Sequence, residues 1–94
     1  LSENGNSVDI AIRVDSPMTD ADHVTAIHIL SERNPYPRVA SFTLSRRAGR
    51  AEVATRIRLA TTQTILVLAE TNTGRVHRDA RQVIVIHGAC VDGG

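Results

Sequence analysis

The one cysteine of the chain, Cys90, is the side chain best suited to covalent chemistry. It lies in the segment HGACVDGG, residues 87–94, where small residues predominate. Glycine-rich terminal segments have little side-chain surface to pack and a large backbone entropy, so we expect residues 88–94 to form a flexible arm. A thiol is largely protonated near neutral pH but is intrinsically a strong nucleophile. These residue types predict an accessible thiol that another molecule can reach.

The neighbours of Cys90 do not make it a self-contained catalytic group. In a flexible arm His87 has no fixed geometry as a general base, and the negative charge of Asp92 disfavours a thiolate. A catalytic cysteine needs an electropositive, preorganised setting. The sequence therefore predicts a thiol on which other proteins act. The alternative is a cysteine that is incidental.

Four further residues, Asp20, Asp22, His23 and His28, have side chains that can ligate metals. Their spacing matches no metal-ligand signature, so we expect no metal site. The favoured interpretation is that Asp20 or Asp22 makes a local hydrogen bond in a turn and that His23 is an ordinary loop residue. His28 is then a hydrogen-bonded histidine in a strand.

Arg56 and Arg58 project from one face of a predicted strand, with Glu52 and Glu70 as candidate neighbours. Such a pattern is typical of a solvated face or of charges paired across strands. Contact with an anion or a partner protein is the alternative.

Composition narrows the class of protein. A chain of 94 residues with 41% hydrophobic residues can form one domain with a modest core, and an aromatic content of 2% makes that core aliphatic. The net charge of +1 and the scarcity of aromatic side chains argue against nucleic acid as a partner. No apolar run has the length needed to cross a membrane. We expect no cofactor.

Alternation of apolar and polar residues predicts the elements that must hold these side chains. Val8, Ile10, Ile12 and Val14 share one face, and this period of two indicates a half-buried strand. The predicted strands cover residues 8–15, 23–31, 38–44, 52–60, 63–70 and 75–87.

The connections between these strands are also predicted. Residues 1–6 are expected to be a polar lead-in that contains a turn. The proline at 17 indicates a loop over 16–22, with room for one helical turn, and the prolines at 35 and 37 indicate a break at 34–37. The segment 45–49, which is basic and ends in glycine, indicates a turn, and so does Asn72-Thr73-Gly74.

Two of the predicted strands are irregular. Strand 23–31 does not alternate strictly, which indicates a bulge or cover on both faces. A kink is expected in the last strand near residues 79–81. The whole pattern predicts an all-β protein, an antiparallel immunoglobulin-like β-sandwich over residues 1–87 that carries the flexible C-terminal arm 88–94.

The chain resembles a known family. The segments ENGN (3–6), SPMT (16–19), DHV (22–24), NP (34–35) and RAEVATRIRLA (50–60) resemble SoxY, the sulfur-carrier subunit of the bacterial Sox thiosulfate-oxidising system. The resemblance extends over residues 1–94. Its most specific parts are the long arginine-bearing strand and the cysteine near the end.

The resemblance implies a non-catalytic, periplasmic carrier with an immunoglobulin-like fold. It implies a heterodimer with a SoxZ-like subunit and pathway intermediates held covalently on Cys90. It also implies three partner enzymes: a SoxAX-like haem enzyme that joins thiosulfate to the thiol, a SoxB-like hydrolase that releases sulfate, and a sulfane dehydrogenase. The carrier arm consists of Gly88, Ala89, Val91, Asp92, Gly93 and Gly94 around the cysteine.

The arm departs from the Gly-Gly-Cys-Gly-Gly pattern of the family. Ala89 replaces the second glycine, and Val91-Asp92 is inserted before the last two. These changes indicate a carrier with altered partner tolerance, a SoxY-like paralogue with a related sulfur cargo, or an engineered tail.

Two other classes of function stay open on the sequence alone. One is a periplasmic β-sandwich interaction module in which Cys90 is incidental or forms an intermolecular disulfide. The other is a cysteine enzyme or metalloprotein that uses His87 or the Asp20/Asp22/His23 group. Self-association through Cys90 or through a sheet edge is a further expectation.

Overall fold

The structure, a computed structural model, describes residues 2–33, 38–45 and 48–87. In this part of the chain every regular element longer than a single turn is a β-strand. The strands are β1 (Ser2–Asn4), β2 (Val8–Val14), β3 (Val24–Ser31), β4 (Arg38–Thr43), β5 (Ala51–Ile57), β6 (Gln63–Thr71) and β7 (Val76–His87). The predicted all-β class is confirmed. Within the described residues no helix is long and apolar enough to cross a membrane.

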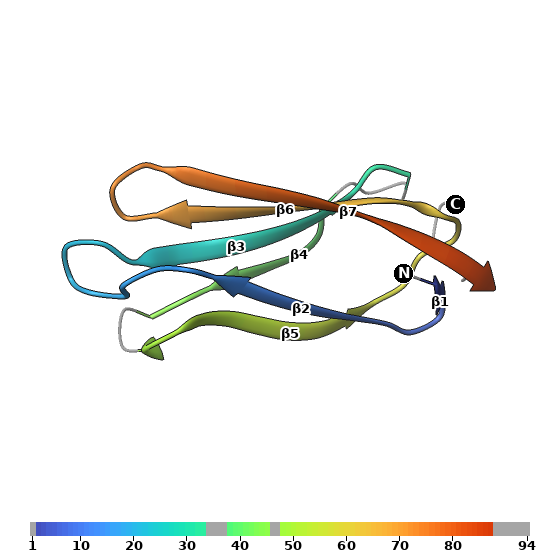
Figure 1. The fold of residues 1–94 in the computed structure, drawn as a ribbon, viewed down its shortest axis with the longest axis horizontal. Coiled ribbons are helices and arrows are strands. Elements are labelled where there is room, and N and C mark those ends of the chain that lie inside the picture. Colours follow the sequence, from blue (N-terminus) through green and yellow to red (C-terminus); the bar gives the residue numbers. More distant parts are fainter. Residues whose placement is uncertain (1, 34–37, 46–47, 88–94) are drawn as a thin grey trace.

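The strands form two sheets of unequal size that pack face to face. The larger sheet has the order β1-β7-β6-β3-β4, and the smaller one consists of β2 and β5. The molecule is elongated, 43 × 20 × 17 Å, and the small sheet lies along one face of the large one (Figure 1). The central position of β6 agrees with its continuous apolar run, which indicates a strand covered by neighbours on both sides.

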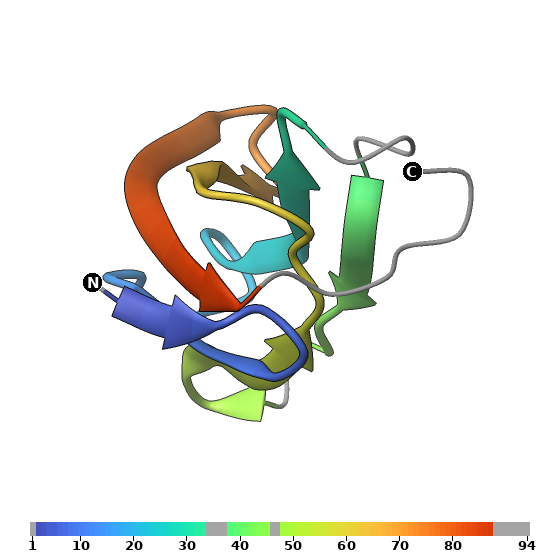
Figure 2. The ribbon, with the colours of Figure 1, turned by 90° about the vertical axis from the view of Figure 1, so that its right-hand side faces the viewer.

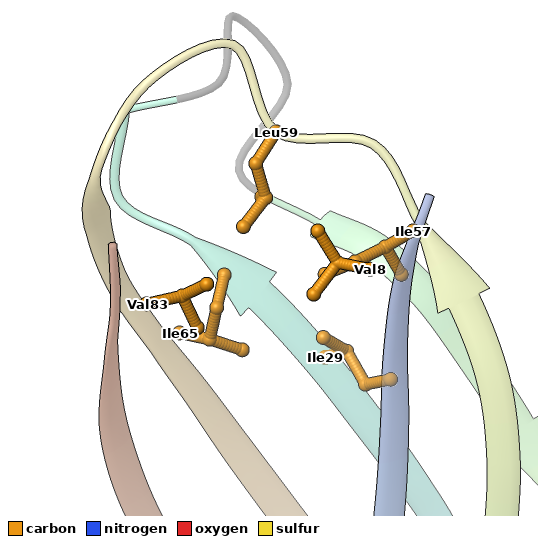
Figure 3. Packing of buried hydrophobic residues seen from close by; sticks show 6 residues of the cluster. All are labelled: Val8, Ile29, Ile57, Leu59, Ile65 and Val83. Carbon is orange, nitrogen blue, oxygen red and sulfur yellow. The ribbon is translucent and has the colours of Figure 1, made fainter. Parts of the chain in front are cut away.

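The core lies between the two sheets and is aliphatic. Val8 and Ile57 of the small sheet meet Ile29, Ile65 and Val83 of the large sheet (Figure 3). These side chains are at most 5% exposed, so they are removed from water almost completely. The alternation predicted for β2 and β5 is confirmed, because the larger apolar side chains of each strand face inward, whereas Ala11 and Ala54 are exposed.

A second buried cluster fills the other end of the sandwich. Met18 from the loop before β3 packs there with Val24, Ile27, Ala51 and Ala69. Burial of Met18 explains why residues 16–22 keep a fixed path although they form no helical turn. The expected helical turn in this loop is therefore absent, since a buried side chain and local hydrogen bonds hold the loop instead.

Strand β3 contains the irregularity that its sequence indicates. Its register shifts against β6 between Val24 and Ala26, and against β4 between Ile29 and Leu30. An extra residue at a bulge changes which side chains face the core, which breaks strict alternation. The predicted bulge is confirmed.

Strand β7 is continuous where a kink is expected. Its antiparallel pairing with β6 runs without a register shift from Val76 to Val83, across residues 79–81. Figure 2 shows a smoothly curved strand. The charged side chains of Asp79 and Arg81 are exposed, and this part of β7 has no strand partner on its outer edge within the described residues. The backbone therefore does not have to break to accommodate them.

The polar lead-in is the main correction to the sequence-based fold. Residues 2–4 form β1, which pairs in parallel with the end of β7, with Ser2 opposite Ile84 and Asn4 opposite His87. The predicted turn after it is present, since the Ser7 amide donates to the Asn4 carbonyl at 3.1 Å. One pair in an otherwise antiparallel sandwich is therefore parallel.

The remaining boundaries agree with the prediction within a few residues. β5 begins at Ala51 and ends at Ile57, three residues before the predicted end. The Asn72-Thr73-Gly74 turn is confirmed, and Gly74 has a φ of 84°, which glycine adopts without a steric cost. The predicted break at 34–37 lies outside the described residues.

Removing the side chain of Ile29 should destabilise the fold severely. Ile29 is 0% exposed and lies in the cluster that joins the two sheets. We expect Ile29→Ala to lower the free energy of unfolding by about 2–5 kcal/mol, because it leaves a cavity. Urea denaturation measures this. The matched control is Ile86→Ala at a position 65% exposed, where a change within about 0.5 kcal/mol is expected. Equal losses in both variants would contradict the described core.

Candidate functional site

The structure describes the root from which the cysteine-bearing segment leaves the sandwich. The predicted site residues themselves lie outside the described residues: Cys90 and the arm residues Gly88, Ala89, Val91, Asp92, Gly93 and Gly94. His87 is the last described residue and ends β7. At roughly 3.3 Å per residue, the α-carbon of Cys90 lies at most about 10 Å from that of His87.

The last four residues of β7 are held by different partners from the rest of the strand. Pairing with β6 ends at Val83, and β1 pairs with the strand from Ile84 onwards. Opposite β1, the Val85 amide donates to Oγ1 of Thr62 at 2.9 Å. Figure 2 shows the end of β7 beside β1. The strand is thereby tied by β1 up to the last described residue, and by Thr62 on its other edge at Val85.

Thr62 belongs to a loop that is itself anchored by a buried polar side chain. Gln63 is 2% exposed and accepts hydrogen bonds from the hydroxyl of Ser31 and from the amide of Arg33. Its Nε2 donates to the carbonyl of Thr61 at 2.9 Å. A buried amide satisfied in this way fixes its neighbours, so Thr62 is presented to Val85 in one position. The sequence carries no signal for this anchor.

The same loop is tied to the turn after β1. The Leu59 amide donates to the carbonyl of Gly5 at 2.8 Å, and Leu59 is fully buried in the core. This bond connects β1 to the loop that also binds Val85. The root of the arm is therefore coupled to the core through both β1 and the 58–62 loop.

The metal-ligand candidates of the 20–23 segment form a loop with local hydrogen bonds. The Thr19 hydroxyl accepts from the Asp22 amide at 3.1 Å, and Nδ1 of His23 lies 2.8 Å from the Thr19 carbonyl. The turn expected there is present, but Thr19 supplies the side chain and Asp22 contributes its backbone. Among the described residues no group of three His, Cys, Asp or Glu side chains is placed to hold a metal ion.

His28 is a hydrogen-bonded strand histidine, as the sequence predicts. Its Nδ1 lies 2.8 Å from Oγ of Ser41, and its Nε2 lies 3.1 Å from Oε2 of Glu70. The three side chains come from the adjacent strands β4, β3 and β6 on the outer face of the large sheet. A serine, histidine and carboxylate in this order resemble a nucleophile triad, but triads act beside oxyanion donors, and here the hydroxyl stands on a sheet face. The hydrogen bonds of His28 with Ser41 and Glu70 therefore connect three adjacent strands of the large sheet.

The arginine-bearing face of β5 is paired across strands, in agreement with the favoured interpretation. Arg56 binds Asp9 with Nε and Oδ1 3.0 Å apart, and Glu52 binds Arg13 at the same distance. Glu70 lies in the other sheet beside His28, so it is not a neighbour of this face. Exposed pairs of this kind each contribute up to about 1 kcal/mol.

A hollow of about 900 Å³ opens along one side of the sandwich, between β2 and the β6–β7 pair. Its apolar lining includes Ile12 and Val67, and β7 contributes His77, Asp79 and Arg81. Between Val76 and Val83 the outer edge of β7 has no strand partner in the described chain. Charged side chains at such an edge oppose pairing with another sheet.

Loss of the Thr62 hydroxyl should loosen the root of the arm. Thr62→Val keeps the shape of the side chain but removes the acceptor for the Val85 amide, a contact worth about 1 kcal/mol. We expect amide hydrogen exchange at Val85 to accelerate about fivefold, with little change in the centre of β6. Thr62→Ser retains the hydroxyl and should restore protection. Unchanged exchange in Thr62→Val would contradict this anchor.

Comparison with known proteins gives a consistent result. The sequence matches the family described as Sulfur oxidation protein SoxY over residues 1–90. It is 30% identical to the sulfur carrier protein SoxY from Chlorobium limicola f thiosulfatophilum, with a TM-score of 0.70, over 90% of this chain and 70% of that one. No curated protein matches the chain.

Two structures of a superoxide reductase (neelaredoxin) from Ignicoccus hospitalis, each of a different variant, share the fold. One has a TM-score of 0.77 at 10% identity, and the other has 0.78 at 11%; each match covers 89% of this chain and 73% of the other. At this identity the likeness concerns the fold alone. The immunoglobulin-like sandwich expected from the sequence is confirmed by the SoxY structure and by the two packed sheets.

The family match covers both sheets of the sandwich and continues through residue 90, beyond the tied end of β7. The match to a solved sulfur carrier covers nearly the whole chain. The chain belongs to the SoxY family of sulfur oxidation proteins, which implies a role as a sulfur carrier within a SoxYZ complex.

Proposed function

We propose that this protein holds sulfur intermediates covalently on Cys90 and presents them to partner enzymes, without catalysing their conversion itself. One observation carries the proposal: the family match ends at residue 90, on the only cysteine of the chain. Cys90 follows the last described residue of β7 by three positions. The sandwich then serves as the body that carries the thiol.

The position of the cysteine suits delivery to a separate active site. Pairing with β1 and Thr62 ties the chain down to His87, and only residues 88 and 89 separate that point from the thiol. Both are small, glycine and alanine, so the segment is thin enough to enter a narrow channel. The paired end of β7 gives the arm a defined starting point, and the small residues at 88 and 89 give the thiol access to the active site of a partner enzyme.

Loading the thiol is an oxidation that needs an external electron acceptor. Cys–SH and S₂O₃²⁻ give Cys–S–S–SO₃⁻, in which a new S–S bond joins the thiol sulfur to thiosulfate, with release of one proton and two electrons. A haem protein of the SoxAX type accepts those electrons. Since the carrier has one cysteine, no second thiol of the same chain can displace the cargo by forming an internal disulfide.

Later steps act on the bound cargo. Water attacks the terminal sulfur, and a SoxB-like hydrolase releases sulfate and two protons while Cys–S–S⁻ stays on the carrier. A sulfane dehydrogenase then oxidises the remaining sulfur: Cys–S–S⁻ and three water molecules give Cys–S–SO₃⁻ and six protons, and six electrons pass to the electron acceptor of the dehydrogenase. The proposal includes a SoxZ-like partner subunit and a periplasmic location, and the family resemblance supports both.

Replacing Cys90 by serine should abolish loading. We expect the intact mass of the wild-type protein to increase by one thiosulfate-derived group after incubation with thiosulfate and the SoxAX-type haem protein, because the thiol is the attachment point. Cys90→Ser should show no increase and keep the wild-type unfolding midpoint. Electrospray mass spectrometry measures the adduct, and urea denaturation measures the midpoint. An adduct on Cys90→Ser, or none on the wild type, would overturn the proposal.

Neutralising Asp92 should speed loading with an anionic substrate. Its carboxylate lies two residues after the cysteine, and at about 7 Å in water two unit charges repel by roughly 0.6 kcal/mol. We therefore expect Asp92→Asn to raise the initial loading rate about two- to threefold at low salt. The gain should shrink as salt screens the charge. A rate that is unchanged at low salt would show that Asp92 does not act on the incoming anion.

A further inference from the structure

Met18, the one methionine of the chain, anchors the loop that joins β2 to β3. Its side chain is 8% exposed, whereas every other residue between β2 and β3 is exposed or half-buried. Figure 1 shows this loop at one end of the sandwich and the end of β7 at the other. The apolar attachment of the loop to the core therefore depends on a single thioether side chain.

The side chain of Met18 lies in the core at a place where the two sheets meet. It shares a buried cluster with Val24, Ile27 and Ala69 of the large sheet and with Ala51 of the small sheet. All four neighbours are apolar. Interiors of this kind are close-packed, so a change in the size or the polarity of the Met18 side chain disturbs the packing of both sheets.

The sulfur of Met18 also accepts a hydrogen bond, which an aliphatic side chain could not do. The amide of Val24 donates to Sδ at 3.4 Å, and Val24 is fully buried. A thioether is a weak acceptor, but a buried amide that loses its acceptor is costly. The sulfur thus ties the loop to the first residue of β3, in addition to filling space in the core.

The backbone of Met18 adopts a strained conformation. Its φ is 51°, and among the described residues it is the one residue other than glycine with a positive φ. A bulky side chain is disfavoured in this left-handed region, and the conformation persists only where the surrounding structure holds it. Burial of the side chain and the bond from Val24 hold it here. Departure of the side chain from the core would let the backbone relax.

The other contacts of the loop are hydrogen bonds at the surface. The Asp22 amide donates to the hydroxyl of Thr19 at 3.1 Å, and Nδ2 of Asn72 donates to the carbonyl of Ala21 at 3.2 Å. Both bonds are exposed to water, which competes for the same groups. A segment held in this way can open locally while the strands stay paired. Opening brings the sulfur of Met18 into contact with small solutes.

We propose that Met18 is a site of reversible oxidation by peroxide, at which formation of the sulfoxide releases the loop 16–22 from the sandwich. One oxygen atom of hydrogen peroxide passes to Sδ, the O–O bond breaks, and the peroxide is reduced to water while the sulfur loses two electrons. The sulfoxide is larger and more polar than the thioether, so the apolar cluster disfavours it. Its release also relieves the strain at a φ of 51°. Methionine sulfoxide reductases restore the thioether.

Amide hydrogen exchange before and after peroxide treatment tests this site. The protein used is Cys90→Ser, so that oxidation of the thiol does not contribute. We expect hydrogen peroxide to add one oxygen atom to Met18, about tenfold more slowly than in the urea-unfolded protein, because the side chain is 8% exposed. Exchange at Val24 should then accelerate about tenfold or more, with exchange at Val67 in β6 and at Val85 in β7 unchanged within about twofold. Incubation with methionine sulfoxide reductases A and B should reverse both changes.

The matched control is Met18→Leu in the same background. Leucine keeps an apolar side chain of similar volume and has no sulfur to oxidise. Exchange at Val24 should be faster than with methionine, because the acceptor is lost, but peroxide should not change it further. Norleucine incorporated at position 18, which has the length of methionine and no sulfur, should behave in the same way.

Each contrary result rejects a defined part of the inference. A sulfoxide at Met18 without faster exchange at Val24 would overturn the release of the loop, and so would a peroxide response of equal size in Met18→Leu. Equal acceleration at Val67 would show that oxidation unfolds the whole sandwich, which also contradicts a local release. Absence of the sulfoxide in the folded protein, with ready oxidation in urea, would overturn the site. None of these measurements involves the thiol, so they are independent of the proposed carrier function.

Discussion

The end of β7 is held by two strands in succession, and the rest of the account depends on that pairing. β6 pairs with β7 as far as Val83, and the three-residue strand β1 takes over from Ile84. A strand end without a partner frays easily. Here β1, the Thr62 hydroxyl and the bond between Leu59 and Gly5 connect it to the core. A thiol three residues further on therefore has a fixed origin.

The two sheets differ in the side chains that they carry on their outward faces. β2 and β5 carry paired charges outward and supply Val8 and Ile57 to the core, so this sheet closes the sandwich and faces water. The inner face of the large sheet supplies Ile29, Ile65 and Val83 to the core. Its outer face carries the exposed side chains of Ile84 and Ile86, together with the hydrogen-bonded group of His28, Ser41 and Glu70.

The sequence predicts those elements whose pattern is local. Alternation identifies β2 and β5, and the irregular apolar spacing of residues 23–31 indicates the bulges of β3. β1 is missed because three polar residues have no periodicity, and their pairing with β7 connects positions at opposite ends of the chain. Thr62 is missed for the same reason. Its bond to Val85 spans 23 residues and depends on the buried Gln63. The candidate thiol, by contrast, is identified by residue type alone, and its arm lies outside the described residues.

The most direct test of the carrier role is the state of the thiol in a working cell. We would purify the protein from cells that are oxidising thiosulfate and measure its intact mass with and without a thiol reductant. The account predicts a sulfur-containing mass increase that maps to Cys90 and disappears on reduction. A free thiol under these conditions, or a mass explained only by a disulfide-linked dimer, would contradict it.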